Sequence, residues 1–202
     1  MTRNQLDSLQ ELVVSTRELM LAVGTTELPS EELDSLRGEV DALAAKIGAA
    51  RRAHVVRAGF EAPARAKVDG KVWHSFANNP FAIPMDLVFE DRTARATLRA
   101  NALHEGPPGC LHGGLAAHVM DCILGTRIQA NGYRARTGTL DIRYVRPTPL
   151  EAPLELFGEI ERSSGRKHFA RGTIRHNGEV TVEATALFVE VAPQQPQEDG
   201  SR

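Results

Sequence analysis

The sequence contains few cysteines and few aromatic residues, and it has no long apolar run. Its 202 residues include two cysteines, Cys110 and Cys122, and 5% aromatic residues. Two cysteines in a chain of this size do not make the disulfide framework of a secreted domain, so the chain suits a reducing compartment. No apolar run approaches the length that spans a bilayer. The first residues, MTRNQLDSLQEL, lack the apolar core of a signal peptide. We therefore expect a cytoplasmic protein without a membrane partner.

A strong charge bias is also absent. The chain carries 24 basic and 26 acidic residues, a net charge of −2, and no long basic block. Proteins that bind nucleic acids usually show a basic patch or stripe, so a nucleic-acid partner is not expected. The composition, 42% hydrophobic and 25% charged, is that of an ordinary globular protein. The length allows one domain with an appendage, or two small domains.

Residues 1–58 are predicted to form a helical extension. One helix is expected from Gln5 to Val23, ended by Gly24. A second is indicated by apolar residues that recur at steps of three and four between Leu33 and Ile47. The preceding Pro-Ser-Glu-Glu, residues 29–32, supplies a capping residue and first-turn acids. Because no reactive constellation lies here, we interpret the extension as structural, with its apolar stripe covering either a partner chain or the body of the protein.

Residues 59–192 are predicted to form an α+β domain. A turn at Asp91-Arg92 separates two short strands, and one helix, from Gly113 to Ala130, follows a loop rich in glycine and proline. About six strands and one long helix predict an antiparallel sheet wrapped around that helix. The polar residues 193–202 are expected to be disordered. The strands expected after the helix are Thr137–Arg146, Leu154–Arg162, His168–His176 and Val180–Val191.

The start of the predicted helix carries His112 followed by two glycines, Gly113 and Gly114. The first turn of a helix has backbone N–H groups without intrahelical partners, and the helix dipole adds partial positive charge there. Glycine lets a ligand oxygen approach these groups closely, so the pattern is typical of an anion site or an oxyanion site. The alternative is a loop that needs two glycines only for its turn geometry.

Asp121 is the one carboxylate on this mostly apolar helix. Most of its neighbours three and four positions away are apolar. We therefore expect it to be desolvated, as suits a general base or a nucleophile. The alternative is a hydrogen bond or ion pair with His118, one turn earlier.

The spacing of these two features limits how they act together. Gly114 and Asp121 are seven residues apart, which corresponds to roughly 10 Å along a helix. One helix therefore cannot present its first turn and its own carboxylate to the same small carbonyl. Two antiparallel copies in a twofold dimer could, so the spacing indicates a site shared between subunits.

Other candidates are weaker. A Cys110 nucleophile with His112 two residues later matches no recognised activation geometry, so a buried or loop thiol is favoured. The histidines, cysteines and Asp121 of this region show no paired ligand spacing, and no metal is expected. Several cations at strand ends could contact phosphates or be simply solvated: Arg143, Arg146, Arg166 and Lys167.

Together these segments resemble the hotdog-fold acyl-CoA thioesterases of the PaaI-like branch. In GPPGCLHGGLAAHVMD, residues 106–121, an HGG motif is followed by a carboxylate nine residues after the histidine. Residues 137–150 are similar to the strand after the family's helix, and residues 78–85 to its first strand and turn. SGRKHFAR, residues 164–171, is similar to a Gly-Arg-Lys segment of relatives that bind coenzyme A. The resemblance covers about residues 71–191.

The resemblance implies a sheet around a central helix, homodimers or homotetramers, acyl-CoA substrates and no cofactor. It implies that Asp121 acts as base or nucleophile, that the N–H of Gly113 polarises the thioester carbonyl, and that sites lie between subunits. His112 would shape the loop or hydrogen-bond near the thioester. The remaining residues expected to contact substrate are Gly114, Thr137, Thr139, Arg146, Arg166 and Lys167.

Two residues depart from the family's pattern. Gly106 stands where some relatives have an asparagine that orients the reacting group, and His118 stands where small or apolar residues are usual. Two other functions are therefore open. One is an enoyl-CoA hydratase or dehydratase that pairs His118 or His104 with a carboxylate. The other is a non-catalytic acyl-CoA-binding module.

Overall fold

The computed structural model describes residues 1–191, so the tail predicted for residues 193–202 lies outside the described residues. The chain separates into two compact units. The smaller unit comprises Met1–Arg57 and Ala77–Ala82. The larger one comprises Ala58–Phe76 and the chain from Ile83 onward.

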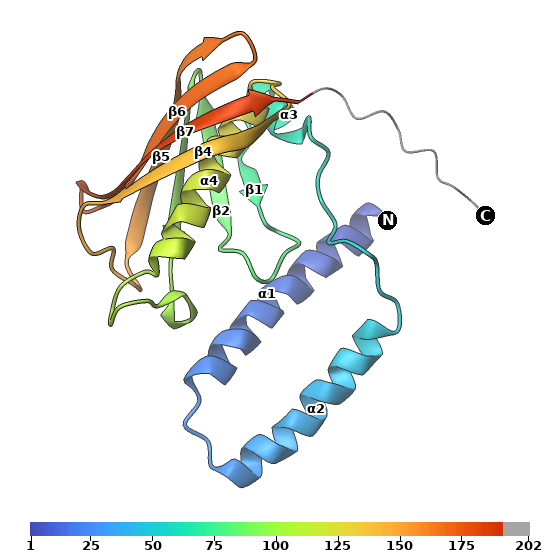
Figure 1. The fold of residues 1–202 in the computed structure, drawn as a ribbon. Coiled ribbons are helices and arrows are strands. Elements are labelled where there is room, and N and C mark those ends of the chain that lie inside the picture. The colour runs from blue at the N-terminus through green and yellow to red at the C-terminus, as the bar shows by residue number, and fades with distance from the viewer. Residues whose placement is uncertain (192–202) are drawn as a thin grey trace. The chain divides into compact units, whose positions relative to one another are not determined.

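The smaller unit contains the two predicted helices, α1 (Arg3–Thr25) and α2 (Ser30–Gly48), drawn in blue in Figure 1. Thr2 caps α1, because its hydroxyl accepts the N–H of Gln5 while the Gln5 side chain accepts the N–H of Thr2. Helix α2 has Pro29 at its N-cap, so no side chain caps it, and the expectation of a capping side chain there was wrong. No helix within residues 1–191 is long and apolar enough to cross a membrane.

The larger unit is an antiparallel sheet with one long helix, α4, packed on it, which confirms the α+β hotdog prediction (Figure 1). The strand order is β1-β2-β3-β5-β6-β7-β4, so β4 forms one edge and pairs only with β7 in the described chain. The helices are α3 (Ala62–Val68), the 3-10 turn η1 (Ala102–His104) and α4 (Gly113–Ala130). The strands are β1 (Trp73–Ser75), β2 (Met85–Glu90), β3 (Thr93–Arg99), β4 (Ala135–Tyr144), β5 (Pro153–Ser164), β6 (Lys167–His176) and β7 (Glu179–Glu190).

Several features differ from the prediction. Helix α3, the 3-10 turn η1 and strand β1 were not predicted. The strand expected within residues 78–85 is also different, because residues 78–84 contain no strand and β2 begins only at Met85. Prolines at positions 80 and 84 explain this difference, since proline cannot donate a hydrogen bond to a sheet.

Helix α4 lies close to the sheet because two glycines face each other beneath it. Gly158 of β5 pairs with Gly172 of β6. A Cβ at Gly158 would lie 3.1 Å from Leu124, and a Cβ at Gly172 would lie 2.5 Å from the Met120 side chain. Both helix residues are fully buried. The missing side chains therefore provide the space into which the helix packs.

We expect the substitution Gly172→Ala to lower the free energy of unfolding by about 1–3 kcal/mol, as overpacking of a core does. The added methyl group would lie 2.5 Å from the backbone oxygen of Phe157, which cannot move without disturbing the sheet. Urea denaturation measures the loss. Gly38→Ala is the control, because this α2 glycine has open space around its Cβ and alanine favours a helix. An equal loss in both variants would contradict the packing argument.

Candidate active site

His112 is the N-cap of α4 and organises its first turn. Its Nδ1 accepts the N–H of Gly114 at 3.0 Å, and its own N–H donates to the carbonyl of His104 at 2.8 Å. The Gly114 N–H is thus already used within the chain. Within residues 1–191, the N–H of Gly113 has no acceptor. Of the two glycines, Gly113 is therefore the one that offers a free donor.

Tyr144, at the end of β4, packs against Gly113. Its hydroxyl donates to the carbonyl of Gly113 at 2.8 Å, and a Cβ at Gly113 would lie 3.2 Å from the tyrosine ring. The first glycine is thus needed for the approach of this ring as well as for access to its N–H. We did not predict Tyr144 as a site residue. The sequence feature that could have indicated its position is its alternation with Leu140 and Ile142 along the strand.

Gly106 has a steric reason to be glycine. A Cβ at this position would lie 2.8 Å from Cα of His112 and 3.2 Å from its Cβ. The loop closes here through the Gly106 N–H, which donates to the carbonyl of Cys110 at 2.9 Å. The asparagine that some relatives carry would not fit unless this loop moved.

His104 supports the same loop. Its Nδ1 accepts the N–H of Asn101 at 2.9 Å, while its carbonyl holds His112. Burial lowers the pKa of His104, which favours the neutral ring that this acceptor role requires. His104 therefore has a structural role in this loop.

Asp121 is held from strand β4. The Thr137 hydroxyl donates to Asp121 Oδ1 at 2.7 Å, and Oδ2 has no hydrogen-bond partner in the described chain. The carboxylate is half-buried in a single chain, so it is less desolvated than expected. His118 instead lies 3.7 Å from the Cys122 sulfur and packs against the Phe76 ring. Within residues 1–191 no hydrogen bond joins His118 to Asp121.

Cys122 is not suited to nucleophilic attack. Burial, together with the charge of Asp121, raises the pKa of Cys122 to about 12, so its thiol stays protonated at neutral pH. Cys110 is half-buried in the loop, and both cysteines are free. In the described residues, no group of three or more His, Cys, Asp or Glu could hold a metal ion.

A bulge in β4 separates the two predicted threonines. Thr137 pairs with Phe188 and Thr139 with Leu187, so Gly138 is an extra residue. Phe188 belongs to the buried core, which places Thr137 on the helix side of the sheet. Leu140 also packs on this core, so its neighbour Thr139 faces the opposite side. Only Thr137 meets Asp121.

The first turn of α4 and the carboxylate lie apart in one chain. Gly113 contacts Tyr144 at the end of β4, whereas Asp121 contacts Thr137 near its start. The helix and the strand thus run in opposite directions. The eight helical steps from Gly113 to Asp121 correspond to about 12 Å. A single chain does not bring the free N–H and the carboxylate to one small group.

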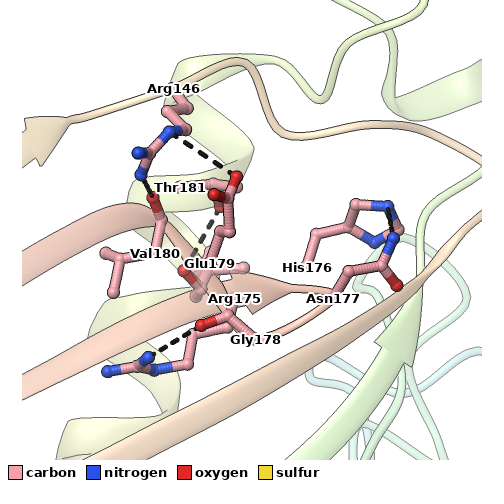
Figure 2. Close-up of polar contacts among 9 residues, drawn as sticks. Arg146, Arg175, His176, Asn177, Gly178, Glu179, Val180 and Thr181 are labelled. Carbon is pink, nitrogen blue, oxygen red and sulfur yellow. Dashed lines mark hydrogen bonds and ion pairs between the residues drawn. The ribbon is translucent and has the colours of Figure 1, made fainter.

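The predicted phosphate-binding cations fall at two ends of the sheet. Arg146 donates to the carbonyl of Val180 at 3.2 Å and forms an ion pair with Glu179 at 3.7 Å (Figure 2). Arg166 donates to the carbonyl of Glu190 at 2.6 Å, next to the exposed Lys167. Glu179 and Glu190 begin and end β7, so these groups are separated by about 36 Å of strand.

The sheet around α4, with its His-Gly-Gly start and central carboxylate, has the hotdog fold of the thioesterase superfamily. A crystal structure of a thioesterase superfamily protein aligns with 90% of this chain and 94% of its own, with a TM-score of 0.77 and 28% identity. The Streptococcus mutans protein smu.793, solved bound to acetyl CoA, aligns with 55% of this chain at 20% identity and a TM-score of 0.51, a likeness of fold.

In sequence, the chain is homologous to the acyl-coenzyme A thioesterases THEM4. The Mus musculus protein is 37% identical over 110 residues, which are 53% of this chain and 46% of the mouse protein. The Bos taurus protein is 35% identical over 92 residues, which are 45% of this chain and 38% of the bovine protein. These matches span less than half the length of the curated relatives. No family model matches the chain.

Proposed function

We propose that the protein hydrolyses acyl-CoA thioesters to a free acid and coenzyme A, acting as a cytoplasmic homo-oligomer of the PaaI-like type. The proposal rests on one observation: a free N–H at Gly113 and a positioned carboxylate at Asp121 lie about 12 Å apart in each chain. Two copies related by a twofold axis would complete two sites. Homology to acyl-coenzyme A thioesterases supports the substrate class.

In the proposed reaction, the thioester oxygen accepts the N–H of Gly113 from one copy. Asp121 of the other copy removes a proton from water, and the resulting hydroxide attacks the carbonyl carbon. The negative charge that develops on the oxygen is stabilised by the Gly113 N–H and the positive end of the helix dipole. The C–S bond then breaks, and the leaving thiolate takes up the proton. Thr137 keeps the carboxylate oriented throughout.

The same arrangement would gather the cations. Arg166 and Lys167 lie near the start of β4, because Glu190 pairs with Ala135 there. Arg146 lies just beyond the other end of β4. When one copy's Gly113 faces the other's Asp121, Arg146 of the first is brought to the side of Arg166 of the second. We propose that they contact the phosphates of one coenzyme A.

The hydratase alternative gains no support from the histidines. His118 packs between Cys122 and Phe76, and His104 is engaged in the loop. The non-catalytic alternative is separated from ours by assay, since tight acyl-CoA binding without thiol release would select it.

Complementation between two inactive variants tests the shared site. Asp121→Asn removes the base, and Gly113→Pro removes the oxyanion donor. Mixed dimers keep one site in which both groups are intact. If subunits mix at random, half the dimers are mixed and half their sites are active, so about one quarter of wild-type activity should return. The assay is thiol release by the mixture after co-expression with two different tags.

Each variant expressed alone provides the control and should stay inactive. Mixtures that show only the sum of the two separate activities would contradict the shared site. Full activity in either variant alone would instead contradict the role of its residue.

A further inference from the structure

Helix α2 exposes an apolar stripe along its whole length. No residue of the helix is buried. The five large apolar residues are between 41% and 50% exposed: Leu33, Leu36, Val40, Leu43 and Ile47. Soluble monomers rarely leave a contiguous apolar strip of this kind uncovered. The first half of α1, by contrast, is engaged, because Leu9 and Val13 line a pocket with residues 52–56, and of the stripe only Ile47, its last residue, reaches that pocket.

The spacing of the stripe indicates what covers it. The five residues follow one another at steps of three, four, three and four, which places them at alternating a and d positions of two heptads. A helix that packs on a globular core usually has a wider apolar face. A strict a/d seam is the pattern of helices that pair with one another in a coiled coil.

The charges beside the seam fit a second copy of the same helix. With Leu33 at position a, Glu32 and Glu39 occupy g positions, and Arg37 and Ala44 occupy e positions. In a parallel, in-register pair, each g residue faces the e residue five positions later on the other helix. Glu32 of each copy then faces Arg37 of the other, and Glu39 faces Ala44. Lys46 also occupies a g position, but its counterpart Arg51 lies beyond the end of α2, so no like charges meet within the helix.

The contact that Arg37 makes within its own chain does not prevent this pairing. Arg37 lies 3.3 Å from Asp34, and the two side chains are 72% and 69% exposed. Ion pairs this exposed contribute little and rearrange readily. The Glu32 side chain is also exposed, and it makes no hydrogen bond within the described residues.

We propose that α2 pairs in parallel and in register with α2 of a second copy, through the seam from Leu33 to Ile47. Two heptads are too short to associate stably alone. The pairing therefore acts together with the other contacts between subunits, which raise the effective concentration of one helix near the other. This inference goes beyond acyl-CoA hydrolysis and does not depend on it, although it rests on the homo-oligomer proposed above. The helices thereby contribute to the choice of subunit partner.

Cysteine cross-linking tests the seam. In a chain with Cys110→Ala and Cys122→Ala, Val40→Cys places a thiol at an a position, where two copies meet. Mild oxidation of the full chain should convert most of it to a disulfide-linked dimer. Asp41→Cys is the matched control, because position b points away from the seam, and its dimer yield should be several-fold lower. Equal yields in both variants, or no dimer in either, would overturn the proposal. The second result is expected if α1 covers the stripe.

A charge exchange tests the register independently of the cysteine. In the Val40→Cys background, Glu32→Arg alone or Arg37→Glu alone places like charges opposite each other and should lower the dimer yield several-fold. The double variant restores opposite charges across the seam, and its yield should recover. An antiparallel pair brings g positions to g positions, so failure of the double variant to recover would overturn the parallel register.

Discussion

Replacing Asp121 with asparagine is expected to lower kcat for acyl-CoA hydrolysis by about 10²–10⁴-fold, the usual contribution of a general base. Asparagine keeps the size of the side chain and an oxygen that accepts from Thr137. The fold and the proposed oligomer should therefore survive, and the loss should lie in the chemical step. Release of free thiol from a panel of acyl-CoAs measures it.

A neighbouring carboxylate provides the control. Asp141 is exposed on β4, beyond the bulge, and β4 is the strand that carries Thr137. Asp141→Asn should leave kcat within about twofold of the wild type, because surface charges away from a reacting group have small effects. If Asp121→Asn retained full activity, the carboxylate would have no part in the reaction. If both variants lost activity equally, the effect would be structural.

Replacing Gly113 with proline is expected to lower kcat by about 10²–10³-fold relative to Gly113→Ala, as the loss of one oxyanion donor does. Both substitutions add a Cβ that would lie 3.2 Å from the Tyr144 ring. Only proline also removes the N–H. Comparing the two variants therefore isolates the donor from the crowding.

The backbone accepts proline at this position. Gly113 is the first residue of α4, where proline is favoured because its missing N–H has no partner in the helix. His112 has φ −60° and ψ 130°, the conformation preferred before proline. Circular dichroism and the oligomeric state should match those of Gly113→Ala. Equal kcat values in the two variants would show that the N–H does not act on the substrate.

The sequence was most informative where local signals agreed. The bounds of α4 were predicted correctly, because a glycine- and proline-rich loop precedes Gly113 and Asn131-Gly132 follows Ala130. The turn between β2 and β3 was also predicted correctly, since Asp91-Arg92 divides two runs in which apolar and polar side chains alternate. The strands of the C-terminal half were predicted to within two residues at each end. In all these places the chain's own periodicity and turn residues decide the structure.

Features set by distant contacts could not be predicted. The Asp91 turn is tied to α4 by the buried guanidinium of Arg127, which donates to the Asp91 carbonyl and to Asn131. Burial lowers the pKa of Arg127 to about 10, so it still carries its charge at neutral pH. Nothing in the spacing of these residues indicates that they meet. The bulge at Gly138, which turns Thr139 away from the helix, is equally invisible in the alternation of side chains.

Because β4 lies at the edge of the sheet, variants of this protein should be compared for solubility as well as for activity. Nine of the ten residues of β4 pair with β7, and within residues 1–191 no strand pairs with its other side, which leaves a row of backbone donors and acceptors there. A long unprotected edge of this kind recruits other chains into mixed aggregates. A substitution that weakens the proposed subunit pairing would thus be seen first as poor yield of soluble protein, before any change in turnover. The yield of soluble protein at matched expression should therefore be measured together with the kinetic constants of each variant on this strand.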